Sequence, residues 1–532
     1  MNDATAAFLD IGGCRAWVAA LPLLSPLQAQ EMLLEQLLRL NEAALAGDER
    51  FALLESLRDP SRFAQGEAMK RYCGRPLPLA PLEQAASDRA LALWRALATA
   101  YRSCLTAAEA ATGPLDGNDP RAPALATFCQ RGLAALADEH IDSMRAGRRV
   151  DDTFWRAVHG FYASAERLGL ASVPVADALR GNPTTSVVAA YAEINLLAAA
   201  GLHELPPRQQ GWVIQWAGRW ADRILIGAAP PAESPSLPLC VDLAGDAPPD
   251  FRPRQGPGAR WLDTAALRLT LKKRMVLLVR GESPASLGLG EDCTQPAVGD
   301  TLRRIYPRWV KGGVTRRYAR HPLSGPCRFV AGIDPIHYYV AGHQPFKPPG
   351  SVDNGELRRQ RDELATFGRV ATRFDDDYSH DHGFQMESWA VEEDWGLFDQ
   401  SADGLRLVRP LDQAGGRLGI GQLVAVQPAG RSDILLGVVR WTQVTALQMV
   451  AGIQLLPGRP QAVGVRRTGL MATPDPYQRG FLLPDSIVLP SGLYKADRIV
   501  ETWTEMVSRR FRLGELIERG TDFERASCAE LA

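Results

Sequence analysis

The chain has 532 residues, enough for roughly three or four domains of ordinary size. With 46% hydrophobic and 23% charged residues, its composition excludes wholesale disorder and a fibrous repeat. The 60 Lys and Arg residues nearly balance the 61 Asp and Glu residues, so the net charge is −1. A protein that coats nucleic acid or membranes would carry a large positive excess, and any anion site must therefore be local.

Eight cysteines are scattered along the chain without a C-x-x-C pair, which indicates neither a zinc site nor a dense disulfide framework. The N-terminal residues lack the basic and apolar segments of a secretory signal. No stretch of about 18 apolar residues occurs without a charge. We therefore expect a cytoplasmic protein with reduced thiols and no membrane insertion.

The first 230 residues are predicted to be mainly helical. Ser25, Pro26 and Gln28 form a capping-box sequence before a leucine-rich amphipathic helix. A further helix is expected to end at Gly201, a natural C-cap. Three tryptophans recur at four-residue spacing on one helical face, and a packed seam between helices is favoured there over a partner-binding groove. They are Trp212, Trp216 and Trp220.

The residue pattern changes from helix-like to strand-like in the second half of the sequence. Eight prolines between residues 228 and 258 preclude a regular helix there. From about residue 325, β-branched and aromatic residues gather in short runs separated by Gly, Pro and Asp, which is typical of a small antiparallel barrel or sandwich. The predicted fold class is therefore multidomain α+β, with an α-helical N-terminal half, an antiparallel β-barrel and a small β-rich C-terminal segment.

The predicted domain organisation has five parts. They are an α-helical domain for effector function or partner docking (1–228), a Pro-rich linker (229–258), a helical connector (259–310), a β-barrel with an insertion at about 343–385 (311–470) and a β-rich C-terminal extension (471–532).

Seven basic residues lie from Arg303 to Arg320 with no acidic residue among them. Such a run is more often a solvated helix face than a ligand site. Its end, with Arg316, Arg317 and Arg320, leads directly into strand-like sequence. Arginine side chains bind phosphate in a bidentate manner and match O6 and N7 of guanine. Two or three of them at a strand entry predict a clamp for a guanine nucleotide.

A second motif, D-x-S-x-x-G, comprises Asp399, Ser401 and Gly404 on a predicted turn between two strands. A carboxylate there can accept hydrogen bonds from guanine N1–H and N2–H, and a serine hydroxyl can fix the turn or bind a phosphate oxygen. Glycine permits a positive φ and the close approach of a ligand. Each motif alone is a weak signal.

Together with the strand-like segments 421–426, 436–441 and 450–453, the two motifs resemble those of the PilZ family. The resemblance covers about residues 310–470 and implies a six-stranded barrel that binds cyclic di-GMP. It implies that Arg316 and Arg320 hold phosphate and the guanine Hoogsteen edge, with help from Arg317. It also implies that Asp399 and Ser401 contact the other guanine edge, while the motif glycine shapes the turn.

One feature departs from that family. Arg320 and Asp399 stand 79 positions apart, more than is usual there, and a polar insertion accounts for the excess. A rival R-x-x-x-R pair, Arg369 and Arg373, lies at the more usual distance from Asp399. We favour the earlier pair because an apolar strand follows it, whereas the acidic sequence FDDDYSHDH follows Arg373.

Other chemistry has less support. The acidic and histidine residues of 375–382 offer metal ligands, but a solvated acidic loop is favoured. There is no P-loop, and Cys293 stands where a dinucleotide fingerprint beginning at Gly288 needs its third glycine. No nucleophile–base set is visible. We therefore expect no metal, no cofactor and no catalytic residues.

The sequence thus predicts a non-enzymatic bacterial receptor whose barrel binds cyclic di-GMP and whose helical half docks a protein partner. The arginine segment is expected to order over the ligand and to change the arrangement of the domains. The alternative is a structural adaptor whose barrel has lost the ligand and binds another protein. A third interpretation takes residues 303–320 as a nucleic-acid patch, which would bind with strong salt dependence; no nucleic-acid partner is expected.

Overall fold

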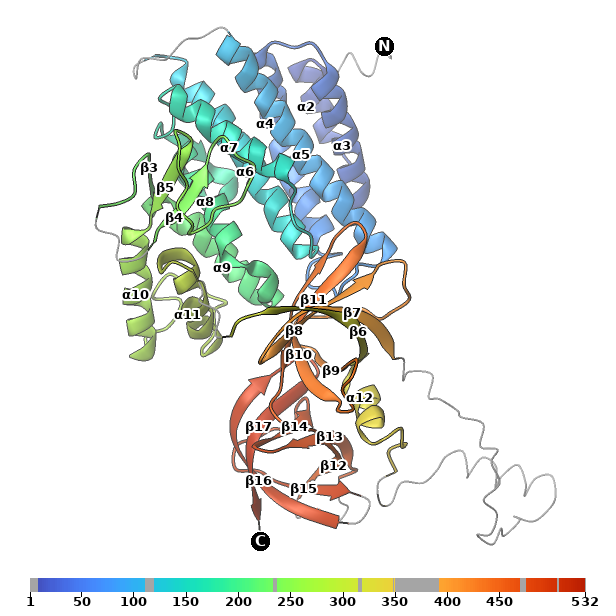
Figure 1. Ribbon diagram of the computed structural model, residues 1–532. Coiled ribbons are helices and arrows are strands. Elements are labelled where there is room, and N and C mark those ends of the chain that lie inside the picture. Colours follow the sequence, from blue (N-terminus) through green and yellow to red (C-terminus); the bar gives the residue numbers. More distant parts are fainter. Residues whose placement is uncertain are drawn as a thin grey trace, which may run out of the picture. The chain divides into compact units, whose positions relative to one another are not determined.

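The computed structural model describes residues 8–110, 119–232, 237–313, 318–347, 349, 392–468, 475–504 and 507–531. The chain forms two compact units, Met1–Arg317 with Thr442–Ala446 and Tyr318–Trp441 with Leu447–Ala532. The first is mostly helical and the second is built mostly of strands (Figure 1). The predicted multidomain α+β class is confirmed.

The helical unit packs its helices around one hydrophobic core. On one helix, Leu33, Leu37 and Leu40 recur at three- and four-residue spacing and are all buried, as an amphipathic helix requires. The helices are α2 (Ile11–Ala19), α3 (Pro26–Glu42), α4 (Gly47–Met69), α5 (Pro81–Ala110), α6 (Ala122–Arg145), α7 (Asp152–Arg167), α8 (Val187–Ala200), α9 (Pro207–Trp220), α10 (Ala265–Val279) and α11 (Ala297–Val310).

Two local predictions in this unit are confirmed and one is wrong. The three tryptophans of α9 are at most 1% exposed and belong to the core, as expected. Gly201 ends α8 with a φ of 66°, the left-handed conformation that favours glycine. Ser25 precedes α3, but its side chain accepts no capping hydrogen bond. Its ψ of 76° differs from the extended backbone of a capping residue, so the predicted capping box does not form.

The Pro-rich stretch contains part of a small sheet. β4 (Leu239–Asp242) lies within it and pairs with β5 (Ala259–Asp263), which pairs on its other side with β3 (Leu225–Gly227). A second pair, β1 (Val175–Asp177) and β2 (Asn182–Thr185), flanks the short 3-10 helix η1 (Ala178–Arg180). These short strands pack on the helices without forming a separate core.

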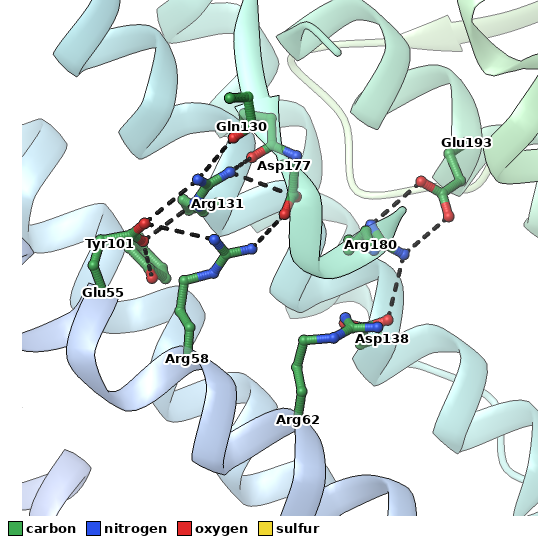
Figure 2. Close-up of polar contacts among 11 residues, drawn as sticks. Glu55, Arg58, Arg62, Tyr101, Gln130, Arg131, Asp138, Asp177, Arg180 and Glu193 are labelled. Carbon is green, nitrogen blue, oxygen red and sulfur yellow. Dashed lines mark hydrogen bonds and ion pairs between the residues drawn. The ribbon is translucent and has the colours of Figure 1, made fainter. Parts of the chain in front are cut away.

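A buried ionic network holds η1 against the helices (Figure 2). Asp177 is 1% exposed and accepts hydrogen bonds from Arg58 Nη2 at 2.7 Å and Gln130 Nε2 at 2.9 Å. Arg131 donates to Glu55 at 3.2 Å and lies 3.5 Å from Asp177. Because a buried charge without a partner is costly, these pairs fix the relative positions of α4, α6 and β1.

The same network continues along the helices in Figure 2. Arg180 contacts Glu193 of α8 at 2.9 Å and Asp138 of α6 at 3.3 Å, and Arg62 of α4 contacts Asp138 at 2.9 Å. Asp138 and Glu193 therefore each have a guanidinium partner. The charged side chains of this group are thus compensated by one another.

The second unit contains two closed barrels of six strands each. The first barrel comprises β6 (His321–Ala331), β7 (Glu393–Ser401), β8 (Gly404–Pro410), β9 (Leu423–Pro428), β10 (Leu435–Val444) and β11 (Gln448–Leu455). The second comprises β12 (Gln461–Arg467), β13 (Gln478–Leu483), β14 (Ser486–Pro490), β15 (Ile499–Thr504), β16 (Val507–Arg519) and β17 (Phe523–Leu531). The expected β-rich C-terminal segment is thus a closed barrel in its own right. Between β6 and β7 lies α12 (Ile333–Val340).

Two adjacent leucines of α3 test the packing of the helical core. Leu37 is fully buried and Leu38 is 51% exposed. Leu37→Ala is expected to lower the unfolding free energy by about 2–5 kcal/mol, because it removes buried methyl groups and leaves a cavity. Leu38→Ala, with the same change in helix propensity, is expected to cost less than about 1 kcal/mol. Urea unfolding followed by circular dichroism measures both, and equal losses would contradict the assigned packing.

The network around Asp177 predicts a pH dependence of stability. Burial alone would raise the pKa of Asp177, but the hydrogen bond and charge of Arg58, with Gln130 and Arg131, lower it below the usual value. A carboxyl whose folded-state pKa is lowered stabilises the fold above its unfolded pKa, near 3.9, and this stability is lost as pH falls through the folded-state pKa.

Asp177→Asn is therefore expected to cost about 3–5 kcal/mol near pH 6, because it leaves buried guanidinium groups without their anion. The difference from the unsubstituted protein should shrink as pH falls below about 4. Asp59→Asn, at an exposed position of α4, is the matched control and should show neither effect. A penalty for Asp177→Asn that does not change with pH would contradict the lowered pKa.

Candidate functional site

The D-x-S-x-x-G motif forms the hairpin between β7 and β8. Ser401 is the last residue of β7, pairs with Gly404 at the start of β8, and leaves a two-residue turn between them. Its hydroxyl lies 3.0 Å from Asp403 Oδ1 and 3.4 Å from the carbonyl oxygen of Gly404. The serine therefore fixes the turn from within, one of the two roles expected from the sequence.

Gly404 is needed for packing between strands. A Cβ atom at this position would lie 3.0 Å from the carbonyl oxygen of Ile453 on β11 and 3.4 Å from Ser401 Oγ. Its φ lies outside the left-handed region, so the turn does not use the positive φ that glycine permits. The glycine instead allows β11 to approach β8 closely.

The carboxylate of Asp399 lies between two arginines. Arg320 Nη1 donates to Oδ1, and Arg406 Nε lies 3.2 Å from Oδ2. The Asp399 side chain is 11% exposed, whereas those of Arg320 and Arg406 are 24% and 31% exposed. Two guanidinium groups facing one carboxylate leave a local excess of positive charge at the barrel surface. Such a group can bind an anion, because arginine retains donors after forming one ion pair.

An exposed aromatic ring lies beside this cluster. Phe398 is 57% exposed and is the extra residue of a β-bulge between Leu397 and Asp399. The Arg406 guanidinium lies over its ring, 5.0 Å from the centroid. Bulges often turn a side chain outward next to a functional site. A flat aromatic ring beside paired arginines is a suitable surface for stacking a nucleobase.

Arg406 and Phe398 were not identified from the sequence. The signal for Arg406 was present, because the Ser401–Gly404 turn pair places Asp399 opposite Arg406 in the antiparallel ladder. Phe398 could not be found in this way, because strict alternation in β7 does not predict the bulge.

The structure brings Arg320 together with Asp399, Ser401 and Gly404 across 79 positions of sequence. The other arginines of the predicted clamp, Arg316 and Arg317, lie outside the described residues. The same is true of the rival pair, Arg369 and Arg373, and of the acidic and histidine residues of 375–382.

The earlier part of the basic run is largely neutralised within α11 and its neighbours. Arg303 pairs with Asp300, Arg308 lies 2.6 Å from Glu204, and Arg304 donates to the Glu204 carbonyl at 3.3 Å. A surface that binds nucleic acid needs cations available for phosphates. These contacts argue against the nucleic-acid interpretation of residues 303–320.

The helical unit holds a polar cavity of about 570 Å³ between α4, α6, α8 and α9. Its lining includes four arginines, and each has an acceptor in the described structure: Arg62 with Asp138, Arg145 with Asp142, Arg180 with Glu193, and Arg219 with the Gly288 carbonyl. The arginines around Asp399 are paired too, but an exposed ring, Phe398, lies beside them, whereas the aromatic residue of the cavity lining, Trp94, is buried. The barrel surface is therefore the stronger candidate site for a nucleotide.

The described residues contain no group of three or more His, Cys, Asp or Glu side chains arranged to hold a metal ion. Within the same part of the chain, no helix combines the length and the hydropathy needed to cross a bilayer.

Comparison with known proteins adds evidence from the other half of the chain. A family model described as the N-terminal domain of the cyclic-di-GMP receptor FimW matches residues 12–231, which lie in the helical unit. The curated cyclic-di-GMP receptor FimW of Pseudomonas aeruginosa is 24% identical over 339 residues, covering 62% of this chain. The chain spans about half the length of that relative, since the aligned part is 53% of it. The helical unit is therefore similar to part of a known receptor.

The ion pairs at Asp399 predict coupled effects on barrel stability. Asp399→Asn and Arg406→Gln are each expected to cost about 1–2 kcal/mol, less than a fully buried pair because the arginines are partly exposed. The double variant should be less destabilised than the sum of the two, by about 0.5–1 kcal/mol. Thermal unfolding of the four proteins measures this coupling, with Asp394→Asn, at an exposed position of β7, as control. Strict additivity would contradict a direct pair.

Proposed function

We propose that this chain is a cyclic di-GMP receptor that acts in signalling and not as an enzyme. The observation that carries the proposal is the meeting of Arg320, Asp399 and Ser401 at one edge of a six-stranded barrel. The similarity of residues 12–231 to the N-terminal domain of the receptor FimW supports it independently, because those residues contain none of the barrel motifs. The first barrel is proposed to be of the PilZ type.

Binding would exchange partners at Asp399. Without ligand, the carboxylate is paired with Arg320 and Arg406. Guanine N1–H and N2–H can donate to the same oxygens, which releases Arg320 to bind phosphate or the guanine Hoogsteen edge. Phe398 would stack on the base. The ion pair between Arg320 and Asp399 is thus replaced by hydrogen bonds from guanine to Asp399 and from Arg320 to the ligand. Because Asp399 is already largely removed from water, the exchange requires little additional desolvation of its carboxylate.

The other arginines of the clamp would come from the segment before β6. The first segment of the helical unit ends at Arg317, and the second unit begins at Tyr318. Arg316 and Arg317 therefore belong to one unit and Arg320 to the other. A ligand that orders this segment would act on the chain at that division. We propose that it thereby changes the domain arrangement and that the helical half binds a protein partner in the cytoplasm.

Isothermal titration with cyclic di-GMP tests the proposal, with GTP and cyclic di-AMP as competitor controls. Saturable binding of cyclic di-GMP alone is expected. Arg320→Ala and Asp399→Ala should weaken it by roughly 10- to 100-fold or more, because each removes charge-assisted hydrogen bonds to the ligand. Arg328→Ala is the matched control: it lies on β6, the strand that follows Arg320, at an exposed position, and pairs with Glu392.

The outcomes separate the alternatives. Loss of binding in Arg373→Ala but not in Arg320→Ala would move the clamp to the rival pair. No heat and no thermal shift of the unsubstituted protein at high ligand concentration would reject the receptor and favour the structural adaptor. Binding that is equally strong for GTP, or that disappears at moderate salt, would indicate nonspecific anion binding.

A further inference from the structure

The two barrels of the second unit have the same strand connectivity. If the strands of each barrel are numbered one to six along the chain, both close in the order 1-2-3-6-5-4. In both, the second and third strands form a hairpin with a two-residue turn. The second barrel therefore repeats the fold of the first, and their residues can be matched through the hydrogen-bonded ladders.

The two hairpins differ in chemistry at the turn. Ser401 pairs with Gly404 across the first turn, and Leu483 pairs with Ser486 across the second. Leu483 thus takes the position of the motif serine and Ser486 that of the motif glycine. A leucine cannot fix the turn by a hydroxyl or donate to a phosphate oxygen.

The ion pair is also replaced. Two positions from the turn, Asp399 faces Arg406 in the first barrel, and Phe481 faces Val488 in the second. Phe481 and Val488 are both fully buried. An apolar pair therefore takes the place of the carboxylate and guanidinium that form the candidate site.

The clamp has no counterpart either. The ladders between the first and second strands match Ala462 with Pro322. Counting back from these two residues places Pro460 at the position of Arg320, and Leu456 at the position of the other clamp arginine. Proline carries no side-chain donor, and Leu456 is buried.

The corresponding face of the second barrel is already occupied. Phe481, Leu483 and Val488 lie in one hydrophobic cluster with residues of α12 and of the first barrel, among them Ile336 and Leu423. Their strand neighbours Leu482 and Ile487 belong to a separate cluster of second-barrel residues. Because side chains alternate along a strand, the first set faces outward from the second barrel and packs against α12 and the first barrel.

A cavity of about 820 Å³ remains beside β12 and β15, against α12. Among its described lining residues, Lys347 is a cation, whereas burial lowers the pKa of His337 to about 4 and leaves it neutral near pH 7. A cyclic dinucleotide carries two phosphate charges. Its described lining thus holds one side-chain cation, whereas two guanidinium groups lie around Asp399.

We infer that, of the two described barrels, the first carries the nucleotide site, and that the second barrel is a copy of the same fold whose corresponding face packs against α12 and the first barrel. The inference rests on the proposed function, since it concerns where cyclic di-GMP binds. It assigns to the second barrel the role of holding α12, the helix that directly follows β6. Arg320 immediately precedes β6, and α12 follows the opposite end of that strand. The packing of α12 on the second barrel therefore anchors the end of β6 that lies away from the site.

The test measures whether the first barrel accounts for all binding of cyclic di-GMP. The result does not depend on whether one or two nucleotides bind there. Asp399→Ala and Ser401→Ala are titrated with cyclic di-GMP in the full chain, beside Lys347→Ala and Arg479→Ala on the second-barrel side. Asp399→Ala should remove all saturable heat and Ser401→Ala should weaken binding, whereas the other two should leave affinity within about twofold. Thermal unfolding verifies that each variant is folded, and Ser401→Ala keeps the test valid if Asp399→Ala fails to fold.

Photochemical cross-linking of labelled cyclic di-GMP, followed by peptide mapping, locates the ligand directly. Labelled peptides are expected within 311–410 and not within 461–531. Saturable binding that persists in Asp399→Ala, with label in 461–531 or in residues 8–310, would overturn the assignment to the first barrel. Absence of binding by the unsubstituted chain would instead reject the proposed function itself, so the two failures can be distinguished.

Discussion

The partly buried carboxylate of Asp399 is the constraint on which the candidate site depends. A carboxylate with an 11% exposed side chain retains little water, so its charge must be compensated by neighbouring donors. Arg320, just before β6, donates a hydrogen bond to this carboxylate, and Arg406 on the facing strand forms an ion pair with it at 3.2 Å. The backbones of the two arginines differ in mobility. The backbone of Arg406 is hydrogen-bonded within the sheet, whereas Arg320 lies before the first residue of β6. Ligand exchange at Asp399 would therefore move Arg320 and leave Arg406 in place.

The packing of the second unit explains why this edge of the first barrel is available. α12 leaves β6 through Gly332 and packs in the cluster shared with the second barrel. An ion pair between Asp334 and Arg479, at 3.2 Å, and the Arg479 guanidinium over the Phe346 ring add polar contacts at its rim. Such exposed pairs stabilise little by themselves. Burial of the apolar cluster is the larger contribution, and it covers the second barrel while leaving the Asp399 edge of the first exposed.

Much of the local structure could be predicted from residue patterns. Helical spacing located the buried leucines of α3, and the turn motif located the hairpin after Asp399, because both signals are local. The placement of Arg320 and Asp399 at one site was inferred only through a family resemblance, since the two residues are 79 positions apart, and the ion pair between them was not predicted. The capping box at Ser25 was wrong for a physical reason: a suitable residue type does not fix the backbone angle that capping needs. The close approach of β11 to Gly404 could not be read from the motif, because it depends on a strand much further along the chain.

The closure of the second barrel was not predicted, yet its sequence holds a signal for the occupied face. β7 alternates buried and exposed residues from Glu393 to Asp399, as a strand with one solvated face does. β13 and β14 instead carry continuous apolar runs, Phe481–Leu483 and Ile487–Leu489, with both alternating sets buried. A strand that is apolar on both faces must be covered on both faces, here by the interior of its own barrel and by α12 with the first barrel. Loss of alternation in one of two otherwise equivalent hairpins thus distinguishes the barrel whose outer face is packed from the barrel whose outer face keeps an exposed residue, Phe398.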